Sequence, residues 1–208
     1  GSSAVPDVAH QGTSFTLPVG EDAPFPSGPP AASPFEYTGL VVVATQDATT
    51  VTVAGGPAVA LDEGEAHLVD GGLHLGDTVA ASRPVAAYVA AGDIDAGYEG
   101  RLFDLAPTTS WSDRYVTPVT STNNSNEVVR AFLYNPGTSS LPVTVARSNA
   151  TTSTVNVSAQ GQASFLLSSD VGARFSTAGR PFAGLLVITT PGLFWENPHQ
   201  RRTVVPNF

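Results

Sequence analysis

The sequence predicts an all-β protein of two duplicated antiparallel β-sandwich units, jelly-roll or immunoglobulin-like in type, with an extended N-terminal arm. Three observations support this prediction. Apolar residues rarely recur at the i, i+3, i+4 spacing of an amphipathic helix. Thr and Val are abundant, and their branched side chains favour pleated surfaces. Short apolar or alternating runs recur between Gly, Pro, Asn and Asp at intervals of about ten residues, as in sandwiches and barrels.

The expected strands are short runs with alternating or clustered apolar side chains and turn residues at both ends. In the first half they are residues 14–19, 38–44, 49–53, 65–69, 77–81 and 85–90. In the second half they are residues 128–134, 141–147, 152–158, 163–167, 173–176 and 182–189. Pro84 and Pro181 are each expected to stand at the start of a strand, where a missing N–H costs little.

The two halves of the chain repeat the same elements in the same order. LVVVATQDATTVTV, LDEGEAHLV and LGDTVAASRPVAAYVAA in the first half correspond to RAFLYNPGTSSLPVTV, VSAQGQASFLL and VGARFSTAGRPFAGLLVITT in the second. The coinciding residues are Thr52 with Thr144, Gly64 with Gly161, Gly76 with Gly172, and Arg83–Pro84 with Arg180–Pro181, at an offset that drifts from 92 to 97. Gly64 and Gly161 both fall between strands, where a tight turn needs a positive φ.

This repeat predicts the domain organisation. We expect an N-terminal strand and a Pro-rich arm over residues 1–36, and a first sandwich unit over residues 37–112. A second unit, with a C-terminal tail, is expected over residues 113–208. A few loop insertions account for the drift in offset between the two units.

Composition argues against several functional classes. The chain has no Cys, and therefore no disulfide framework, thiolate metal site or cysteine nucleophile. A net charge of −9 without any Lys argues against binding nucleic acid through its phosphates. The longest apolar runs, such as residues 40–44 and 85–91, are far shorter than the roughly 20 residues of a membrane-spanning helix, so no membrane insertion is expected.

The charge is unevenly divided along the chain. Residues 1–104 contain 14 acidic residues and two Arg, whereas residues 105–208 contain four acidic residues and seven Arg. The first half is therefore strongly negative and the second weakly positive. This division permits the acidic end of one copy to meet the basic end of the next, with simple drift in composition between two domains as the alternative.

The strings ATQDATTVTV, LDEGEAHLV, SRPVAAYVAAG and LFDLAPTTSWSDRYVTPVTS resemble the N-terminal domain family of the IgGFc-binding protein. The matching residues are Asp47, Thr49, Thr50, Val51, Gly64, Arg83, Pro84, Val85, Asp104, Leu105, Pro107, Trp111, Tyr115 and Pro118. The chain departs from the family at Ser112, where Gly is usual, and in lacking Cys, which resembles the bacterial or archaeal branch. The resemblance spans about residues 12–190 and implies an extracellular or cell-surface, non-enzymatic module in adhesion or surface structure.

The search for catalytic and metal-binding chemistry yields one candidate. No G-x-S-x-G elbow is present and the four His residues occur singly, so no catalytic residue is assigned. The densest acidic stretch supplies Asp93, Asp95, Glu99 and Asp104 as a candidate calcium site, because hard cations take carboxylate oxygens. The alternative is a solvated acidic loop.

Two further groups of residues are candidates for modification or recognition. Asn123, Asn149 and Asn156 begin N-x-S/T triplets and are candidate glycosylation sites if the protein is exported. The aromatic residues that could form a sugar-binding platform are Tyr98, Trp111, Tyr115 and Trp195. The resemblance favours a packing role for Trp111 and Tyr115 at the junction of the two units.

The N-terminal arm is the main candidate for contact with a partner. An alternating strand places Phe15, Leu17 and Val19 on one face, and Pro-rich residues 22–34 follow it. We expect this arm to dock on its own sandwich or on a neighbouring copy, where it would add a strand to an exposed edge. The C-terminal tail adds two more candidate contact residues, Arg201 and Arg202.

Together these features predict an extracellular structural or adhesive protein without enzymatic activity. It would form a filament or surface assembly from copies of itself, through β-strand and head-to-tail contacts that do not close. One alternative is a monomeric cell-surface adhesion module that binds a glycan or a protein. The second alternative is a calcium-dependent carbohydrate-active enzyme, in which paired carboxylates would converge in a cleft.

Overall fold

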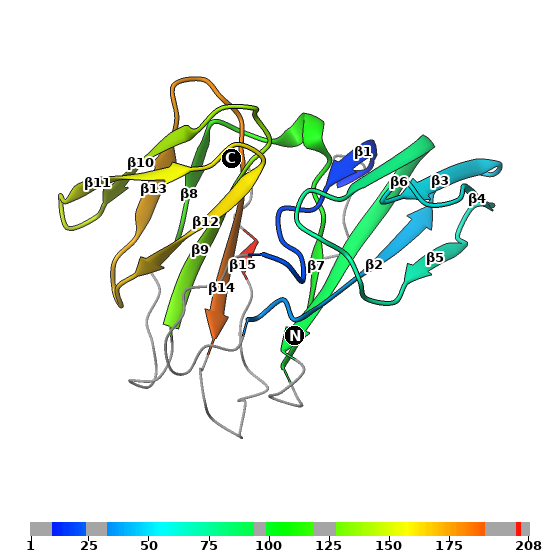
Figure 1. Ribbon diagram of the computed structural model, residues 1–208, viewed down its shortest axis with the longest axis horizontal. Coiled ribbons are helices and arrows are strands. Elements are labelled where there is room, and N and C mark those ends of the chain that lie inside the picture. The colour runs from blue at the N-terminus through cyan, green and yellow to red at the C-terminus, as the bar shows by residue number, and fades with distance from the viewer. Residues whose placement is uncertain (1–9, 24–32, 94–98, 119–127, 190–202, 205–208) are drawn as a thin grey trace. The chain divides into compact units, whose positions relative to one another are not determined.

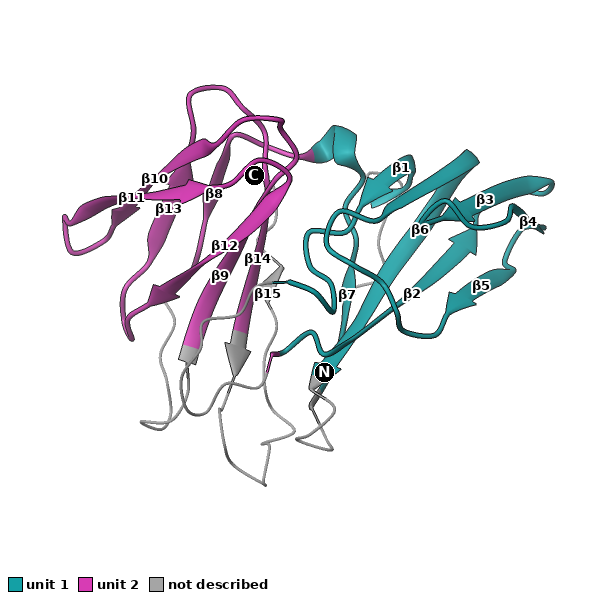
Figure 2. Cartoon of the chain, in the orientation of Figure 1, with its two compact units in different colours: residues 1–23, 34–110 teal, residues 24–33, 111–208 magenta. Residues whose placement is uncertain are grey.

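The computed structural model describes residues 10–23, 33–93, 99–118, 128–189 and 203–204 of the chain. These residues form an all-β structure of antiparallel strands, as predicted (Figure 1). The chain divides into two compact units, which Figure 2 shows in different colours. Unit 1 consists of residues 1–23 and 34–110, and unit 2 of residues 24–33 and 111–208. Within the described ranges, no helix is long and apolar enough to cross a membrane.

Unit 1 is organised around one long strand, β6. Its strands are β1 (Gly12–Thr16), β2 (Tyr37–Ala44), β3 (Thr49–Val53), β4 (Val59–Leu61), β5 (Ala66–Val69), β6 (Thr78–Asp93) and β7 (Glu99–Asp104). Residues 78–81 of β6 pair with β1 and β3, whereas residues 85–93 pair with β2 and β7, and Val85 also lies opposite Gly12 of β1. A single strand of 16 residues therefore takes part in both groups of strands.

Unit 2 builds the same arrangement from separate strands. They are β8 (Arg114–Val116), β9 (Val128–Asn135), β10 (Leu141–Arg147), β11 (Thr152–Val157), β12 (Gly161–Leu167), β13 (Ala173–Ser176), β14 (Ala183–Thr189) and β15 (Thr203–Val204). One sheet has the order β11-β10-β13-β8 and the other β12-β9-β14-β15. The first half of β6 corresponds to β13 and its second half to β14, because their partners occupy matching places in the order.

The strand register confirms the duplication. In unit 1, Thr52 of β3 lies opposite Ala80 of β6. In unit 2, Thr144 of β10 lies opposite Ser176 of β13, in the matching pair of strands. Thr52 and Thr144 therefore occupy equivalent positions, as their sequence correspondence predicted.

The repeat also includes the N-terminal strand, which corrects the predicted arm of residues 1–36. Phe15 of β1 lies opposite Val79, just as Tyr115 of β8 lies opposite Phe175. β1 is thus the first strand of unit 1, and β8 is its counterpart in unit 2. The longer segment of unit 2 begins at Trp111 instead of residue 113. The sequences of these two strands differ too much for pattern reasoning to have matched them.

One predicted pair of glycines is out of register by a residue. Gly64 has a φ of +83°, as expected, but in unit 2 the positive φ of 48° belongs to Gln160 and not to Gly161. The backbone hydrogen bonds agree, since Gly64 N donates to Ala44 O and Gln160 N donates to Gly137 O. Gly64 is therefore equivalent to Gln160.

The remaining differences from the predicted strands have local causes. β4, β8 and β15 span only two or three residues each, too few for a periodic pattern. β7 was not predicted, because its charged residues obscure the alternating pattern of a strand. Arg101 and Phe103 on its inward face are nevertheless buried, with 8% and 4% of their surface exposed. The two strands expected on either side of Pro84 form one continuous strand. Pro84 is tolerated within it because, among the described residues, positions 82–84 have no paired strand residue, so the missing N–H costs little there.

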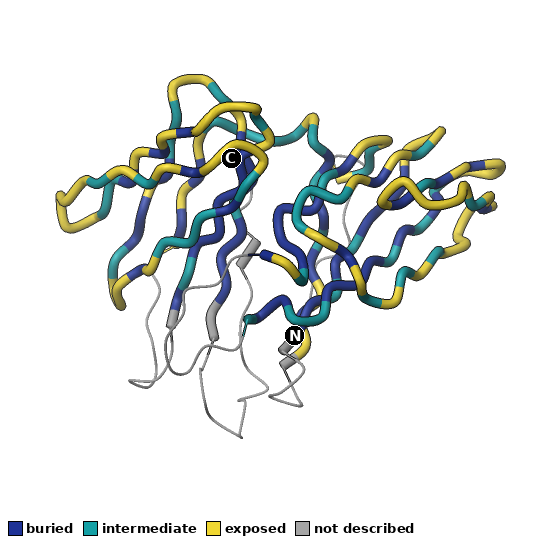
Figure 3. Tube along the Cα trace, in the orientation of Figure 1, coloured by how far each residue is buried: buried dark blue, intermediate teal, exposed yellow. Residues whose placement is uncertain are grey.

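The core of unit 2 lies between its two sheets. β10 alternates between buried and exposed residues, a pattern visible in Figure 3. Its buried residues join inward side chains of the facing sheet in one apolar cluster that includes Val129, Leu133, Leu141, Val143, Val145, Val157, Phe175, Phe182 and Leu186. Burying such side chains contributes roughly 1.5–3 kcal/mol each.

Tyr115 anchors β8, the first strand of unit 2, to the residue just before β14. Its hydroxyl donates to Phe182 O at 2.6 Å and accepts from Ser112 N at 3.1 Å. Its ring meets the Phe182 ring edge-on at 4.8 Å between centroids. Burial raises the pKa of Tyr115 above its ordinary value of 10.0, and the hydrogen bond with Ser112 offsets part of this increase.

Replacing Tyr115 by Phe tests this anchor. The change keeps the ring but removes both hydroxyl hydrogen bonds, so the buried Phe182 carbonyl loses a donor and Ser112 N loses an acceptor. We expect the free energy of unfolding to fall by about 1–3 kcal/mol in urea denaturation. A fall of less than about 0.5 kcal/mol, the usual range of surface substitutions, would contradict the anchoring role.

The raised pKa of Tyr115 also predicts alkaline sensitivity. The unfolded chain ionises this hydroxyl near 10.0, before the folded chain does. Its contribution to stability is therefore fully present below pH 10.0 and is lost as the pH rises through the folded-state pKa. Thermal unfolding across this pH range should show a shallower loss of stability in Tyr115→Phe than in the wild type, and equal slopes would refute the linkage.

Candidate functional site

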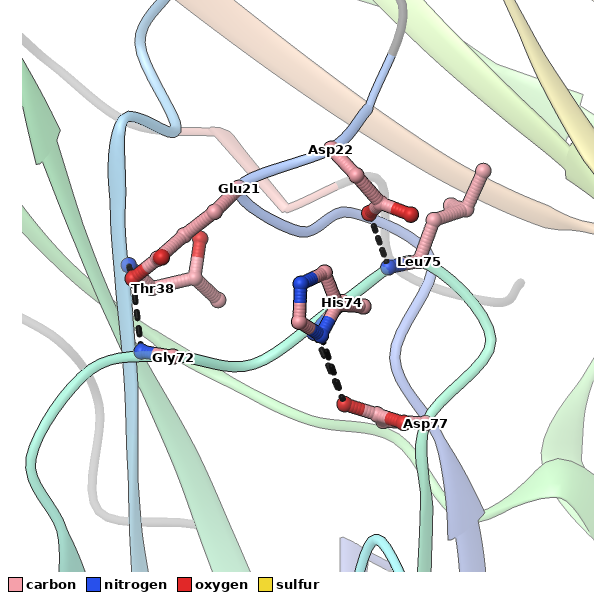
Figure 4. Close-up of polar contacts among 7 residues, drawn as sticks. All are labelled: Glu21, Asp22, Thr38, Gly72, His74, Leu75 and Asp77. Atoms are coloured by element: carbon pink, nitrogen blue, oxygen red, sulfur yellow. Dashed lines mark hydrogen bonds and ion pairs between the residues drawn. The ribbon is translucent and has the colours of Figure 1, made fainter.

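A carboxylate fastens the segment that follows β1 to the rest of unit 1. Glu21 Oε1 accepts hydrogen bonds from Thr38 N at 3.1 Å and from Gly72 N at 2.7 Å (Figure 4). At Gly20 this segment lies so close to the backbone of His74 and Leu75 that a Cβ added there would be 2.2 Å from Leu75 N. Glu21 thus joins three parts of the chain that are far apart in sequence.

The same loop cluster contains two more carboxylates with a similar role. Asp22 Oδ1 accepts from Leu75 N, and Asp77 Oδ2 accepts from His74 N, both at 2.7 Å (Figure 4). The His74 Nδ1 atom also lies 3.9 Å from Asp77 Oδ2, but the His74 side chain is 58% exposed. Such an exposed pair contributes little, so the backbone bonds are the main contribution of these carboxylates.

Carboxylates also fasten the loops between β2 and β5. Asp47 Oδ1 accepts from Glu63 N at 3.1 Å, and Asp62 Oδ1 accepts from Ala48 N at 3.2 Å. Glu65 Oε2 accepts from Asp62 N at 2.8 Å. These acidic residues hold two neighbouring loops together through the backbone.

Unit 2 performs the same task with neutral side chains. Asn135 Oδ1 accepts from Gly137 N at 2.9 Å, and Thr117 Oγ1 accepts from Ala173 N at 2.9 Å. Asn149 Oδ1 accepts from the backbone N of Thr151 at 3.2 Å. The acidic excess of unit 1 therefore has a local structural use, which hydroxyl and amide oxygens fulfil in unit 2.

Only one part of the predicted calcium site is tested by the structure, and Asp104 lies apart from the rest of that site. Asp93 and Glu99 lie opposite each other where β6 meets β7, and Asp95 lies outside the described residues. Asp104 is five residues farther along β7, roughly 16 Å from Glu99 at the usual rise of a strand. One ion cannot reach both, since calcium ligands lie at about 2.3–2.6 Å. Asp104 instead lies 4.0 Å from His10 Nδ1.

No other metal site appears in the described part of the chain. Within residues 10–23, 33–93, 99–118, 128–189 and 203–204, no three His, Asp or Glu side chains are grouped so that they could hold an ion.

The predicted partner-binding face is buried inside unit 1. Phe15, Leu17 and Val19 are each 0% exposed, and β1 pairs with β6 of its own chain. The expectation that this face meets a neighbouring copy is therefore corrected, because its apolar surface already belongs to the core of unit 1. The other two predicted contact residues, Arg201 and Arg202, lie outside the described residues.

The candidate glycosylation sites are only partly described. Asn149 and Asn156 are exposed, the first in the turn before β11 and the second on β11. Asn149 Oδ1 accepts from the Thr151 hydroxyl at 2.6 Å, within its own triplet. Asn123 lies outside the described residues. Glycosylation of these residues stays a prediction.

The aromatic residues have a packing role where they are described. Tyr115 is 6% exposed in the core of unit 2, and Trp111 meets Tyr134 edge-on at 5.9 Å between ring centroids. Trp111 and Tyr115 therefore have a packing role as predicted, but the contacts shown lie within unit 2. Tyr98 and Trp195 lie outside the described residues.

Comparison with known proteins adds little to this picture. No family model matches the sequence, and no curated protein matches it. A solved structure titled "anti-sigma factor domain-containing protein" is 12% identical to the chain, with a TM-score of 0.23. That match covers 85% of this chain and 80% of the other, but at such a score it carries no argument about function.

Substitution of Glu21 tests the loop cluster. Glu21→Ala removes the acceptor of two backbone N–H groups and should lower the free energy of unfolding by about 1–3 kcal/mol. Glu21→Gln keeps an oxygen acceptor and should recover at least half of this loss. Urea denaturation measures both.

Glu63→Ala is the matched control, because this residue takes part in the neighbouring loops through its backbone N. It should change stability by less than about 0.5 kcal/mol. A loss in Glu63→Ala as large as that in Glu21→Ala would show that general charge, and not the backbone bonds of Glu21, determines the effect.

Proposed function

We propose that this chain is a non-enzymatic structural or adhesive module that works outside the cell and assembles with copies of itself. One observation carries the proposal: two units of the same fold differ strongly in charge. Unit 1 contains 14 of the 18 acidic residues and two of the nine Arg, and unit 2 contains the rest. An assembly in which unit 1 of one copy meets unit 2 of the next brings opposite charges together.

Such a contact joins two different surfaces. Contacts of this head-to-tail type form rings if the rotation closes and filaments if it does not. The tandem arrangement supports this geometry, because every copy contributes one acidic and one basic unit. The exchange of the β1 strand between copies is no part of the proposal, since Phe15, Leu17 and Val19 are buried in their own unit.

The extracellular setting is supported by the sequence resemblance. The elements that carry it include Asp47, the pair Arg83–Pro84 and Trp111, and they run through both units. The family resemblance implies modules of adhesion and surface structure. A chain without any Cys or Lys, in which Thr, Ser and Ala are common, fits that setting.

Sedimentation velocity at several protein concentrations tests the self-assembly. We expect the average mass to exceed 21.3 kDa increasingly with concentration at low salt. Salt at 1 M should reverse this, because the Debye length falls from about 10 Å at 0.1 M to about 3 Å. A mass of 21.3 kDa at every concentration and salt level would overturn the self-assembly.

A pair of variants at Arg174 tests whether the charge of this side chain contributes to assembly. Arg174 is exposed on β13 of unit 2. Arg174→Glu reverses a charge on the basic unit and should weaken assembly, whereas Arg174→Lys keeps the charge and should leave it close to that of the wild type. Equal assembly of both variants would show that charge at this surface does not contribute.

A further inference from the structure

Two equivalent edge strands, one in each unit, are open to pairing. β5 is the last strand of the order β4-β3-β6-β2-β5, and β12 is the first of the order β12-β9-β14-β15. In the described ranges, each pairs with one neighbour only, β5 with β2 and β12 with β9. The duplication makes these two edges the same edge of the same fold.

Both edge strands place a large apolar side chain in solvent. Leu68 of β5 is 62% exposed and Leu166 of β12 is 55% exposed. The other two large apolar side chains that are strongly exposed in the described part of the chain are Leu102 on β7 and Val116 on β8. Leu68 and Leu166 are thus the two most exposed large apolar side chains described.

The usual protection of an edge strand is missing from both. Edge strands commonly carry charged residues or Pro, which discourage pairing with another chain. β7 reads EGRLFD and β8 reads RYV, so both of these strands carry charges. β5 reads AHLV and β12 reads GQASFLL, without Asp, Glu, Lys, Arg or Pro.

The surroundings of the two edges have opposite charge. Exposed carboxylates flank β5 at both ends, Glu65 before it and Asp70 after it. Each side of β12 has an arginine: Arg130 Nη1 lies 3.4 Å from Ser164 Oγ, and the Arg147 guanidinium lies 4.8 Å from the centre of the Phe165 ring. The edge of unit 1 is therefore acidic at its ends, and the edge of unit 2 is basic on both faces.

From these observations we infer that β12 of one copy pairs with β5 of a second copy and joins their sheets into one. This inference rests on the proposed self-assembly and names its surface. Backbone hydrogen bonds between the strands supply affinity, and the pairing brings Leu68 and Leu166 out of water together. Because a joined pair of copies still presents one β5 edge and one β12 edge, the contact extends from copy to copy.

Two variants of the full chain test the pairing by blocking one edge each. Leu68→Lys puts a cation on β5 that faces the arginines beside β12. Leu166→Glu puts an anion on β12 that faces Glu65 and Asp70. Sedimentation velocity of each variant alone should give a mass of 21.3 kDa under conditions in which the wild type assembles.

Mixing the two variants gives the decisive measurement. An equimolar mixture should regain complexes of two or more copies, because the intact β12 of the Leu68→Lys chain meets the intact β5 of the Leu166→Glu chain. Failure of the mixture to assemble would overturn the pairing of β5 with β12, since the mixture contains one intact edge of each kind. Contacts between identical edges would instead let one of the two variants assemble alone.

Leu102→Glu and Val116→Lys are the matched controls, with the same kinds of change at exposed side chains on charged edges. They should assemble like the wild type. Circular dichroism checks folding, and Leu68→Ser and Leu166→Ser weaken assembly without adding a charge.

The outcomes separate the two proposals. If the wild type assembles and Leu68→Lys and Leu166→Glu assemble equally well, the interface lies elsewhere and this inference is wrong while the proposed function stands. If the wild type never exceeds 21.3 kDa, the proposed self-assembly fails, and the pairing fails with it.

Discussion

Backbone N–H groups in the loops between strands require hydrogen-bond partners that the sheets cannot supply. Five carboxylates of unit 1 provide such partners. Four of them bind the main chain of a segment that is distant in sequence, and the fifth, Asp77, binds His74 N within its own loop; the four are Glu21, Asp22, Asp47 and Asp62. The strands of a sandwich gain their stability from the buried faces between the sheets. Their connections are held in place by these side-chain oxygens, and the positions of the loops and edges depend on them.

The two units show how one fold accepts two chemical solutions to this constraint. A carboxylate, an amide and a hydroxyl all accept a hydrogen bond from a backbone N–H, so Asn135 and Thr117 serve in unit 2 as acids do in unit 1. The strand order and register are unaffected by the choice. Charge is affected, because unit 1 contains 14 acidic residues and unit 2 only four. Duplication followed by this divergence yields a chain with an acidic and a basic unit.

The edges of the sheets complete this picture of the molecule. Strand β1 covers apolar surface within unit 1, and Phe15 has no exposed area left for a partner. The edges that remain open in the described ranges are different strands, and Leu68 and Leu166 project from two of them. The partner that we propose for such a pair of edges is a copy of the same chain, because it offers the complementary charge.

The sequence by itself determined the fold class, most of the strands and the repeat. Strand periodicity and the spacing of Gly and Pro are local properties, and they were sufficient to match Thr52 with Thr144, which the strand register confirms. The packing roles of Trp111 and Tyr115 followed from the resemblance. The strand and repeat predictions share a cause, since each depends on patterns among residues that are near one another in the chain.

Only the tertiary structure decided where the charged and edge residues lie. Asp104 and Glu99 are close in sequence, but an extended strand holds them apart, so Asp104 does not belong with the acidic residues that it follows. Glu21 binds Thr38 and Gly72, which no local pattern connects. The same holds for β1, since whether an alternating strand completes its own sheet or another's depends on which edge it reaches. Pairing between distant segments is a property of the folded chain, and for this reason the sites required the structure while the strands did not.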